Sequence, residues 1–65
     1  MTLEESIYRC ETAEKRYKEM AEDCLSVNDY DNFAKYIALA EEERTRINYL
    51  KKYKLKNNAG EKQDD

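Results

Sequence analysis

The amino-acid sequence predicts an all-α protein, an antiparallel helical hairpin that assembles into a helix-bundle oligomer. Apolar residues recur in steps of three and four along residues 3–27 and again from residue 33, which is the helical period. The 65-residue chain holds one Gly and no Pro, and its only cluster of turn-forming residues before the C-terminus is 26–29. We therefore expect two helices, near 3–26 and 30–56.

The first helix carries one apolar stripe and a recognisable start. Thr2 is a suitable N-terminal cap, and Glu4 and Glu5 suit the positive end of the helix dipole. Three of the four residues at 26–29 favour turns over helix interiors, so we expect the helix to end there. The stripe consists of Leu3, Ile7, Cys10, Ala13, Tyr17, Met20, Cys24 and Val27.

The second helix begins with Asp29 or Asp31 as its cap and ends in a basic segment. The lysines from Lys51 to Lys56 suit the negative end of its dipole. Residues 57–65 hold a single apolar residue, so we predict a disordered polar tail after a hairpin domain at 1–56. The stripe of this helix reads Phe33, Ile37, Ala40, Arg44, Ile47 and then Leu50 or Lys51.

The register of the hairpin can also be predicted. If the chain turns at residue 28 or 29, facing residues have numbers that add to about 57 or 58. Small residues then oppose large ones at Cys24–Phe33, Ala21–Ile37, Tyr17–Ala40 and Cys10–Ile47. Glu14 faces Arg44, and each is the charged residue in the middle of its own stripe. We predict a structural ion pair between them that sets the register.

Apolar residues outside these stripes indicate self-association. Leu39, Tyr49 and Tyr53 share a second face of the second helix, and Tyr8 and Leu25 lie off the main line of the first. Isolated helical hairpins are rarely stable, whereas two hairpins make a four-helix bundle. We expect these five residues to form an oligomer interface, in a two-fold dimer or a larger assembly.

The net charge of −3 is unevenly distributed. Six basic residues and no acid lie between residues 44 and 56, while the rest of the chain is acidic and disfavours nucleic-acid binding. One interpretation is a surface for an anionic ligand, built from Arg46, Tyr49, Lys52, Tyr53 and Lys56. The competing interpretation is that the lysines pair with acids of the first helix at positions 4, 5 and 11.

The sequence offers no catalytic residues, metal site or cofactor motif. The chain has no His, and its one Gly at position 60 excludes a phosphate-binding loop. The acids Glu41-Glu42-Glu43 are expected on a solvated face. Cys10 and Cys24 would lie about 21 Å apart on one helix, too far for a disulfide. Reduced thiols and the lack of an apolar run of about 20 residues predict a cytoplasmic protein outside the membrane.

The chain resembles known families in two ways. Residues 28–40, from Asn28-Asp29-Tyr30 to Ala40, resemble the helix junction of tetratricopeptide repeats, which implies a similar turn. The hairpin as a whole is similar to short helical-hairpin proteins of bacteriophages and prophages of Gram-positive bacteria. That likeness rests on Ala21-Glu22, the turn at 28–30, Ala40-Glu41-Glu42-Glu43 and Tyr49-Leu50-Lys51-Lys52-Tyr53. It implies a protein that blocks a host protein or sequesters a signalling molecule.

Two functions follow as hypotheses. The first is a small self-associating binding protein without enzyme activity, which blocks a host protein and so inhibits bacterial immunity. The alternative is an oligomer that sequesters an anionic cyclic nucleotide through the basic, Tyr-bearing end of the second helix.

Overall fold

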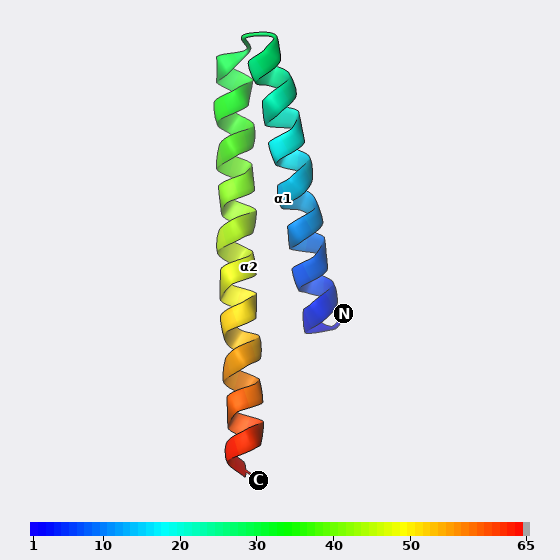
Figure 1. Ribbon diagram of the computed structural model, residues 1–65, viewed down its shortest axis with the longest axis vertical. Coiled ribbons are helices and arrows are strands. Elements are labelled where there is room, and N and C mark those ends of the chain that lie inside the picture. Colours follow the sequence, from blue (N-terminus) through cyan, green and yellow to red (C-terminus); the bar gives the residue numbers. More distant parts are fainter. Residues whose placement is uncertain (65) are drawn as a thin grey trace.

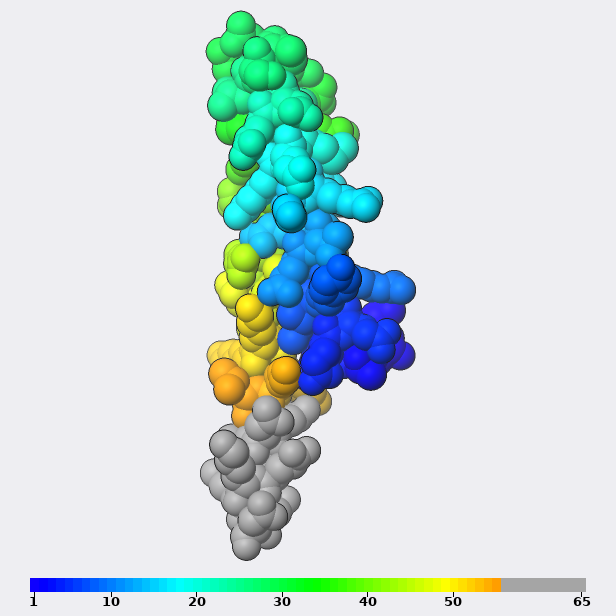
Figure 2. Space-filling model, turned by 45° about the vertical axis from the view of Figure 1, so that its right-hand side comes forward, coloured from blue at the N-terminus to red at the C-terminus, as the bar shows by residue number. Residues whose placement is uncertain are grey.

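The protein is a two-helix antiparallel hairpin in a computed structural model, which describes the backbone of residues 1–64 and the side chains of residues 1–55 (Figure 1). Helix α1 (Leu3–Ser26) and helix α2 (Tyr30–Asp64) lie side by side and are joined by a short turn. The molecule is a narrow rod of 56 × 16 × 14 Å, and its elongated shape is visible in Figure 2. The all-helical hairpin predicted from the sequence is confirmed.

The helix bounds agree with the prediction at three of the four ends. Helix α1 spans Leu3–Ser26 and α2 begins at Tyr30, as expected, but α2 continues through Asp64 instead of ending at residue 56. No Pro stands in this stretch to stop a helix. The polar tail predicted at 57–65 lies outside the residues whose side chains are described, and its disorder stays a prediction.

Helix α1 starts at a threonine cap, Thr2. Thr2 is extended (φ −80°, ψ 164°), and its Oγ1 accepts a hydrogen bond from the backbone N–H of Glu5 at 3.1 Å. The same hydroxyl donates to Oε1 of Glu5 at 3.1 Å. This arrangement satisfies an N–H that has no partner within the helix and fixes where α1 begins.

The turn between the helices is closed by one residue in the left-handed region. Asn28 has φ 61°, a conformation that Asn tolerates better than most residues. The N–H of Asp29 then donates to the carbonyl of Cys24 at 2.8 Å, which closes the end of α1. Asp29 also caps α2, because its Oδ1 accepts from the N–H of Asn32 at 3.3 Å, so Asp29 and not Asp31 is the cap.

A thin core runs along the line where the helices meet. The buried hydrophobic residues within 1–55 are Ile7 and Ala21 of α1 and Ala40 and Ile47 of α2. The two core residues are fourteen positions apart in α1 and seven positions apart in α2. Multiples of seven keep side chains on one line along a helix, here the line where the two antiparallel helices meet. Ile47 is 0% exposed and is the largest fully buried side chain described.

Contacts across the seam define the register. Glu14 pairs with Arg44 and Glu4 with Lys54, and in both pairs the residue numbers add to 58. The rings of Tyr17 and Tyr36 stack with centroids 6.5 Å apart and planes at 20°. The numbers of the stacked tyrosines add to 53 and those of the Glu11–Lys51 pair to 62, so the contacts across the seam lie on both sides of the 57 or 58 that the sequence predicted.

Candidate functional site

The best-organised polar contact of the hairpin joins Glu14 of α1 to Arg44 of α2. The guanidinium donates from Nε to Oε2 at 2.8 Å and from Nη2 to Oε1 at 2.6 Å, and Lys18 Nζ lies 3.5 Å from Oε2. Glu14 is only 6% exposed, whereas about half of the Arg44 side chain is exposed. The hydrogen bonds from Arg44 hold the pKa of Glu14 below its ordinary value, and Glu14 raises the pKa of Arg44. These contacts favour a structural role over a catalytic one.

A second buried carboxylate, Glu43, corrects an expectation. The sequence suggested that the acids at 41–43 are solvated, but Glu43 is 9% exposed, while its two acidic neighbours are exposed. Its Oε2 lies 3.1 Å from Nη1 of Arg46, and its carboxylate helps to raise the pKa of Cys10 on the other helix. Glu43 stands midway between Ala40 and Ile47 in a stripe with steps of three and four, which is the signal that the prediction overlooked.

The thiol of Cys10 lies in an unfavourable place for ionisation. Burial raises the pKa of Cys10, and the neighbouring Glu43 carboxylate raises it further by hydrogen bonding and repulsion. A thiol reacts through its thiolate, so this environment opposes nucleophilic chemistry. Both cysteines are free, as the sequence predicted from their spacing.

The contacts across the seam distinguish two long faces of the hairpin. On one face the Tyr17 and Tyr36 rings stack, and Cys10 and Glu43 lie seven residues from them on the same sides of their helices; we call it the tyrosine face. On the opposite face, which we call the ion-pair face, Lys51 Nζ lies 3.5 Å from Glu11 and Lys54 Nζ lies 3.4 Å from Glu4. The tyrosine face therefore carries an aromatic stack across the seam, whereas the ion-pair face carries ion pairs between the helices.

The predicted ligand surface on α2 is brought together only in part. Tyr49 and Tyr53 are both exposed, as is Lys52, but Arg46 is engaged by Glu43. The side chain of Lys56 lies outside the described residues. Lys51 and Lys54 pair with acids of α1, Glu11 and Glu4. Such pairs are what the competing interpretation of the basic end predicted. These pairs reduce the positive charge that this end offers to a ligand.

The residues predicted to form an oligomer interface are distributed over several surfaces. Tyr8, Leu25, Tyr49 and Tyr53 are exposed, and Leu39 is half-buried. Leu39 follows Tyr36 by one helical turn and so borders the tyrosine face, whereas Leu25 lies close to the turn. An assembly therefore has to cover more than one side of the hairpin to bury all five.

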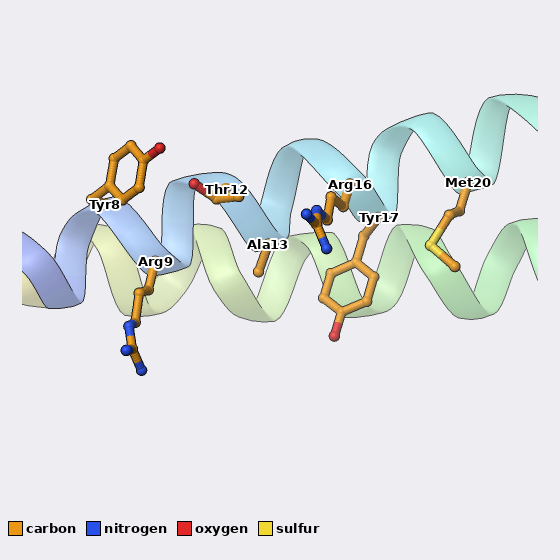
Figure 3. Close-up of a pocket in the computed structure, with 7 residues that line it drawn as sticks. All are labelled: Tyr8, Arg9, Thr12, Ala13, Arg16, Tyr17 and Met20. Carbon is orange, nitrogen blue, oxygen red and sulfur yellow. The ribbon is translucent and has the colours of Figure 1, made fainter.

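A shallow groove on α1 was not anticipated from the sequence. Figure 3 shows Arg9, Tyr17 and Met20 projecting toward the α2 side of the helix and Tyr8 projecting away. Arg9 and Arg16 are exposed, and neither forms an ion pair within residues 1–55. The groove is lined by Tyr8, Arg9, Thr12, Ala13, Arg16, Tyr17 and Met20. The two arginines are seven residues apart and so lie on the same side of α1, and this spacing in the sequence could have indicated the groove.

Neither a metal centre nor a membrane span is found in the described part of the chain. Within it, His, Cys, Asp and Glu do not gather in groups of three or more that could hold a metal ion. Neither helix has, over the residues described, the apolar length that crossing a bilayer takes. No protein-family model, curated protein or solved structure matches this chain. Its function is therefore argued from its own residues.

Proposed function

We propose that this protein is a self-associating helical hairpin that works as a binding protein without enzyme activity. The observation that carries the proposal is the contrast between a thin core and a large uncovered apolar surface. Two isoleucines and two alanines are the hydrophobic residues buried within residues 1–55. Nine large hydrophobic residues of the same range are exposed, among them the aromatic residues Tyr8, Tyr30, Tyr49 and Tyr53.

The core of a single hairpin is too small to hold two long helices in place. Burying an Ile contributes roughly 1.5–3 kcal/mol, whereas ordering each residue of the backbone costs about 1–2 kcal/mol. Helical stability in proteins comes mainly from packing of an apolar face, and two hairpins packed together supply a second seam for each helix. Self-association on one face therefore buries part of this exposed apolar surface.

We further propose that the assembled protein binds and blocks a host protein, in the setting of a bacteriophage or prophage. The support for the setting is the resemblance to short phage-encoded hairpins. Support for a protein target comes from the turn, where Leu25, Val27 and Tyr30 are exposed around a backbone held by capping hydrogen bonds. Exposed apolar residues on a rigid element are typical of sites that bind other proteins.

Sequestration of an anionic cyclic nucleotide is the second candidate. It is favoured by the exposure of Tyr49 and Tyr53 next to Lys52, since aromatic rings stack on bases and lysines attract phosphate. The ion pairs of Lys51 and Lys54 with α1 weaken this interpretation, because they partly neutralise the basic end. We therefore rank protein binding first.

Self-association is tested by sedimentation velocity and by thermal unfolding over a range of protein concentrations. We expect an oligomer at micromolar concentration and a melting temperature that rises with concentration, because association stabilises the folded state by mass action. A monomer at about 100 µM with a concentration-independent melting temperature would contradict the proposal.

The two candidate functions are separated by ligand and lysate experiments. A panel of linear and cyclic nucleotides should leave the melting temperature unchanged if the target is a protein, whereas a bound nucleotide at 100 times its Kd stabilises by about 2.7 kcal/mol. Affinity capture from a bacterial lysate, read by mass spectrometry, should recover a host protein with the wild type. The matched control is a variant with Val27→Asp and Tyr30→Asp, which should lose that protein but keep its oligomeric state.

A further inference from the structure

We propose that the tyrosine face packs on the same face of a second copy, about a two-fold axis parallel to the hairpin, so that Arg16 of each copy pairs with Glu42 of the other. This inference rests on the self-association proposed above and specifies its geometry. It starts from the side chains that border the tyrosine face on each helix, in successive helical turns.

On α1 these side chains are those of the groove. Starting from Ala13, one turn after Cys10, the row extends to Arg9, Arg16 and Met20 in steps of three and four. The two arginines flank the small side chain of Ala13, which leaves room between them (Figure 3). This side of α1 thus presents two positive charges and a shallow apolar floor.

On α2 the corresponding row follows Tyr36 and Glu43. Leu39 and Arg46 each lie three residues further along, and Glu42 and Tyr49 complete the row in the same steps of three and four. Glu42 is exposed and forms no ion pair within residues 1–55, as is also true of Arg16. Each row therefore holds an unpaired charge of the opposite sign.

The symmetry axis decides which residues meet. A two-fold axis parallel to the rod leaves every residue at its own height, so the register within one hairpin also applies between α1 of one copy and α2 of the other. Numbers that add to 58 bring Arg16 level with Glu42 and Arg9 level with Tyr49. The first contact is an ion pair, and the second places a guanidinium beside an aromatic ring.

The apolar contacts agree with this register. Met20 of one copy comes level with Leu39 of the other, within one residue, so two half-covered apolar side chains meet. Because the interface is isologous, each of these contacts occurs twice.

The main competing arrangement is electrostatically unfavourable. A two-fold axis perpendicular to the rod and centred on the groove packs α1 against α1, which sets the arginines at 9 and 16 of one copy against those of the other. Like charges in contact oppose association and act against the wrong partner or register. The row on α2 instead offers Glu42 and Tyr49 to the arginines of the groove, and its own cation, Arg46, is paired with Glu43.

Charge reversal in the full-length protein tests the arrangement. In sedimentation equilibrium, Arg16→Glu and Glu42→Lys should each weaken the dimer about tenfold or more, since each puts two like-charged pairs into the interface. Mixing the two single variants should restore the association, because both contacts of the mixed dimer are then between opposite charges. The double variant should also dimerise with near wild-type affinity.

Matched controls use the neighbouring residues. Lys15→Glu and Glu41→Lys make the same charge changes one position away, on other sides of the helices, and should leave the dissociation constant within about twofold. Circular dichroism checks that each variant keeps its helical content. If a single variant fails to fold, Arg16→Gln and Glu42→Gln replace it, and each should weaken the dimer less than a reversal.

The outcomes separate this arrangement from self-association itself. A wild-type dimer whose affinity is unaffected by reversal, or is not rescued by mixing, overturns the Arg16–Glu42 contact and leaves the proposed function standing. An assembly of more than two copies overturns the closed two-fold arrangement. A monomeric wild type overturns both proposals.

Discussion

Arg44 reaches across from α2 and holds both carboxylate oxygens of Glu14 on α1, at 2.8 and 2.6 Å, in the middle of the seam between the helices. This two-point contact fixes the sliding of one helix along the other as well as their rotation, because a bidentate pair tolerates little displacement. The register of the hairpin depends on this contact.

Removing the carboxylate of Glu14 should destabilise the hairpin. We expect Glu14→Ala to lower the free energy of unfolding by about 2 kcal/mol, since Arg44 loses both acceptors while half of its side chain remains in solvent. Glu19→Ala, an exposed position of α1, is the matched control and should change it by less than about 0.5 kcal/mol. Equal effects in urea unfolding would refute a structural role for the pair.

The same pair predicts a dependence of stability on pH. The pKa of Glu14 is lowered in the folded state, chiefly by the hydrogen bonds from Arg44, so Glu14 stabilises the fold above its ordinary value of 4.5. This contribution is lost as the pH falls from 4.5 through the lower pKa of the folded state. The difference in unfolding free energy between wild type and Glu14→Gln should therefore shrink in that acid range. A difference that stays constant down to the acid-unfolded state would contradict this.

Replacing Glu43 should have the opposite effect on stability from replacing Glu14. Its partner Arg46 comes from its own helix and is well exposed, so no charge is left buried when Glu43 is replaced. We expect Glu43→Leu to raise the unfolding free energy by about 1 kcal/mol, because an apolar side chain then fills a buried position on the seam. Thermal unfolding at fixed protein concentration measures it, with Glu41→Leu, at an exposed position two residues away, as the control. A lower melting temperature for Glu43→Leu would mean that the buried carboxylate contributes net stability.

The Cys10 thiol should resist alkylation in the folded protein. Burial and the Glu43 carboxylate raise its pKa, so less thiolate is present at a given pH than in the unfolded chain. In a Cys24→Ser variant, which leaves Cys10 as the sole thiol, we expect iodoacetamide to react about tenfold more slowly without urea than in urea. Adding Glu43→Gln should speed alkylation of Cys10 in the folded protein. Equal alkylation rates with and without urea would contradict a raised pKa of Cys10.

The turn depends on one residue with positive φ. Replacing Asn28 (φ 61°) by Ala should lower the free energy of unfolding by about 1 kcal/mol. A Cβ disfavours the left-handed region, and Ala lacks the polar side chain with which Asn offsets this cost by local hydrogen bonding. Asn28→Gly should be neutral or slightly stabilising, since Gly adopts this conformation without strain. Asn48→Ala, at an exposed helical position, is the matched control and should not destabilise. Equal stability of the Ala and Gly variants at position 28 would contradict the expectation.

Much of the hairpin was predictable because its determinants are local. The bounds of α1, the start of α2 at Tyr30 and the facing of Glu14 and Arg44 follow from helical periodicity, capping residues and one turn signal. The choice of Asp29 over Asp31 as the cap of α2 did not follow, since both residues suit that position and only the closing of the turn distinguishes them.

The sequence by itself determined that this chain forms two amphipathic helices of matched register, because a period of 3.6 residues and a break at 26–29 admit few other arrangements. The tertiary structure alone decided which of two neighbouring rows on α2 turns inward. Residues 43 and 44 are adjacent and both lie near the seam, and the rotation of the helix buries Glu43 while Arg44 reaches across from the edge. That rotation also leaves Glu42 exposed. The reason is physical: periodicity defines a face only to within about 100°, and packing against the other helix selects the angle.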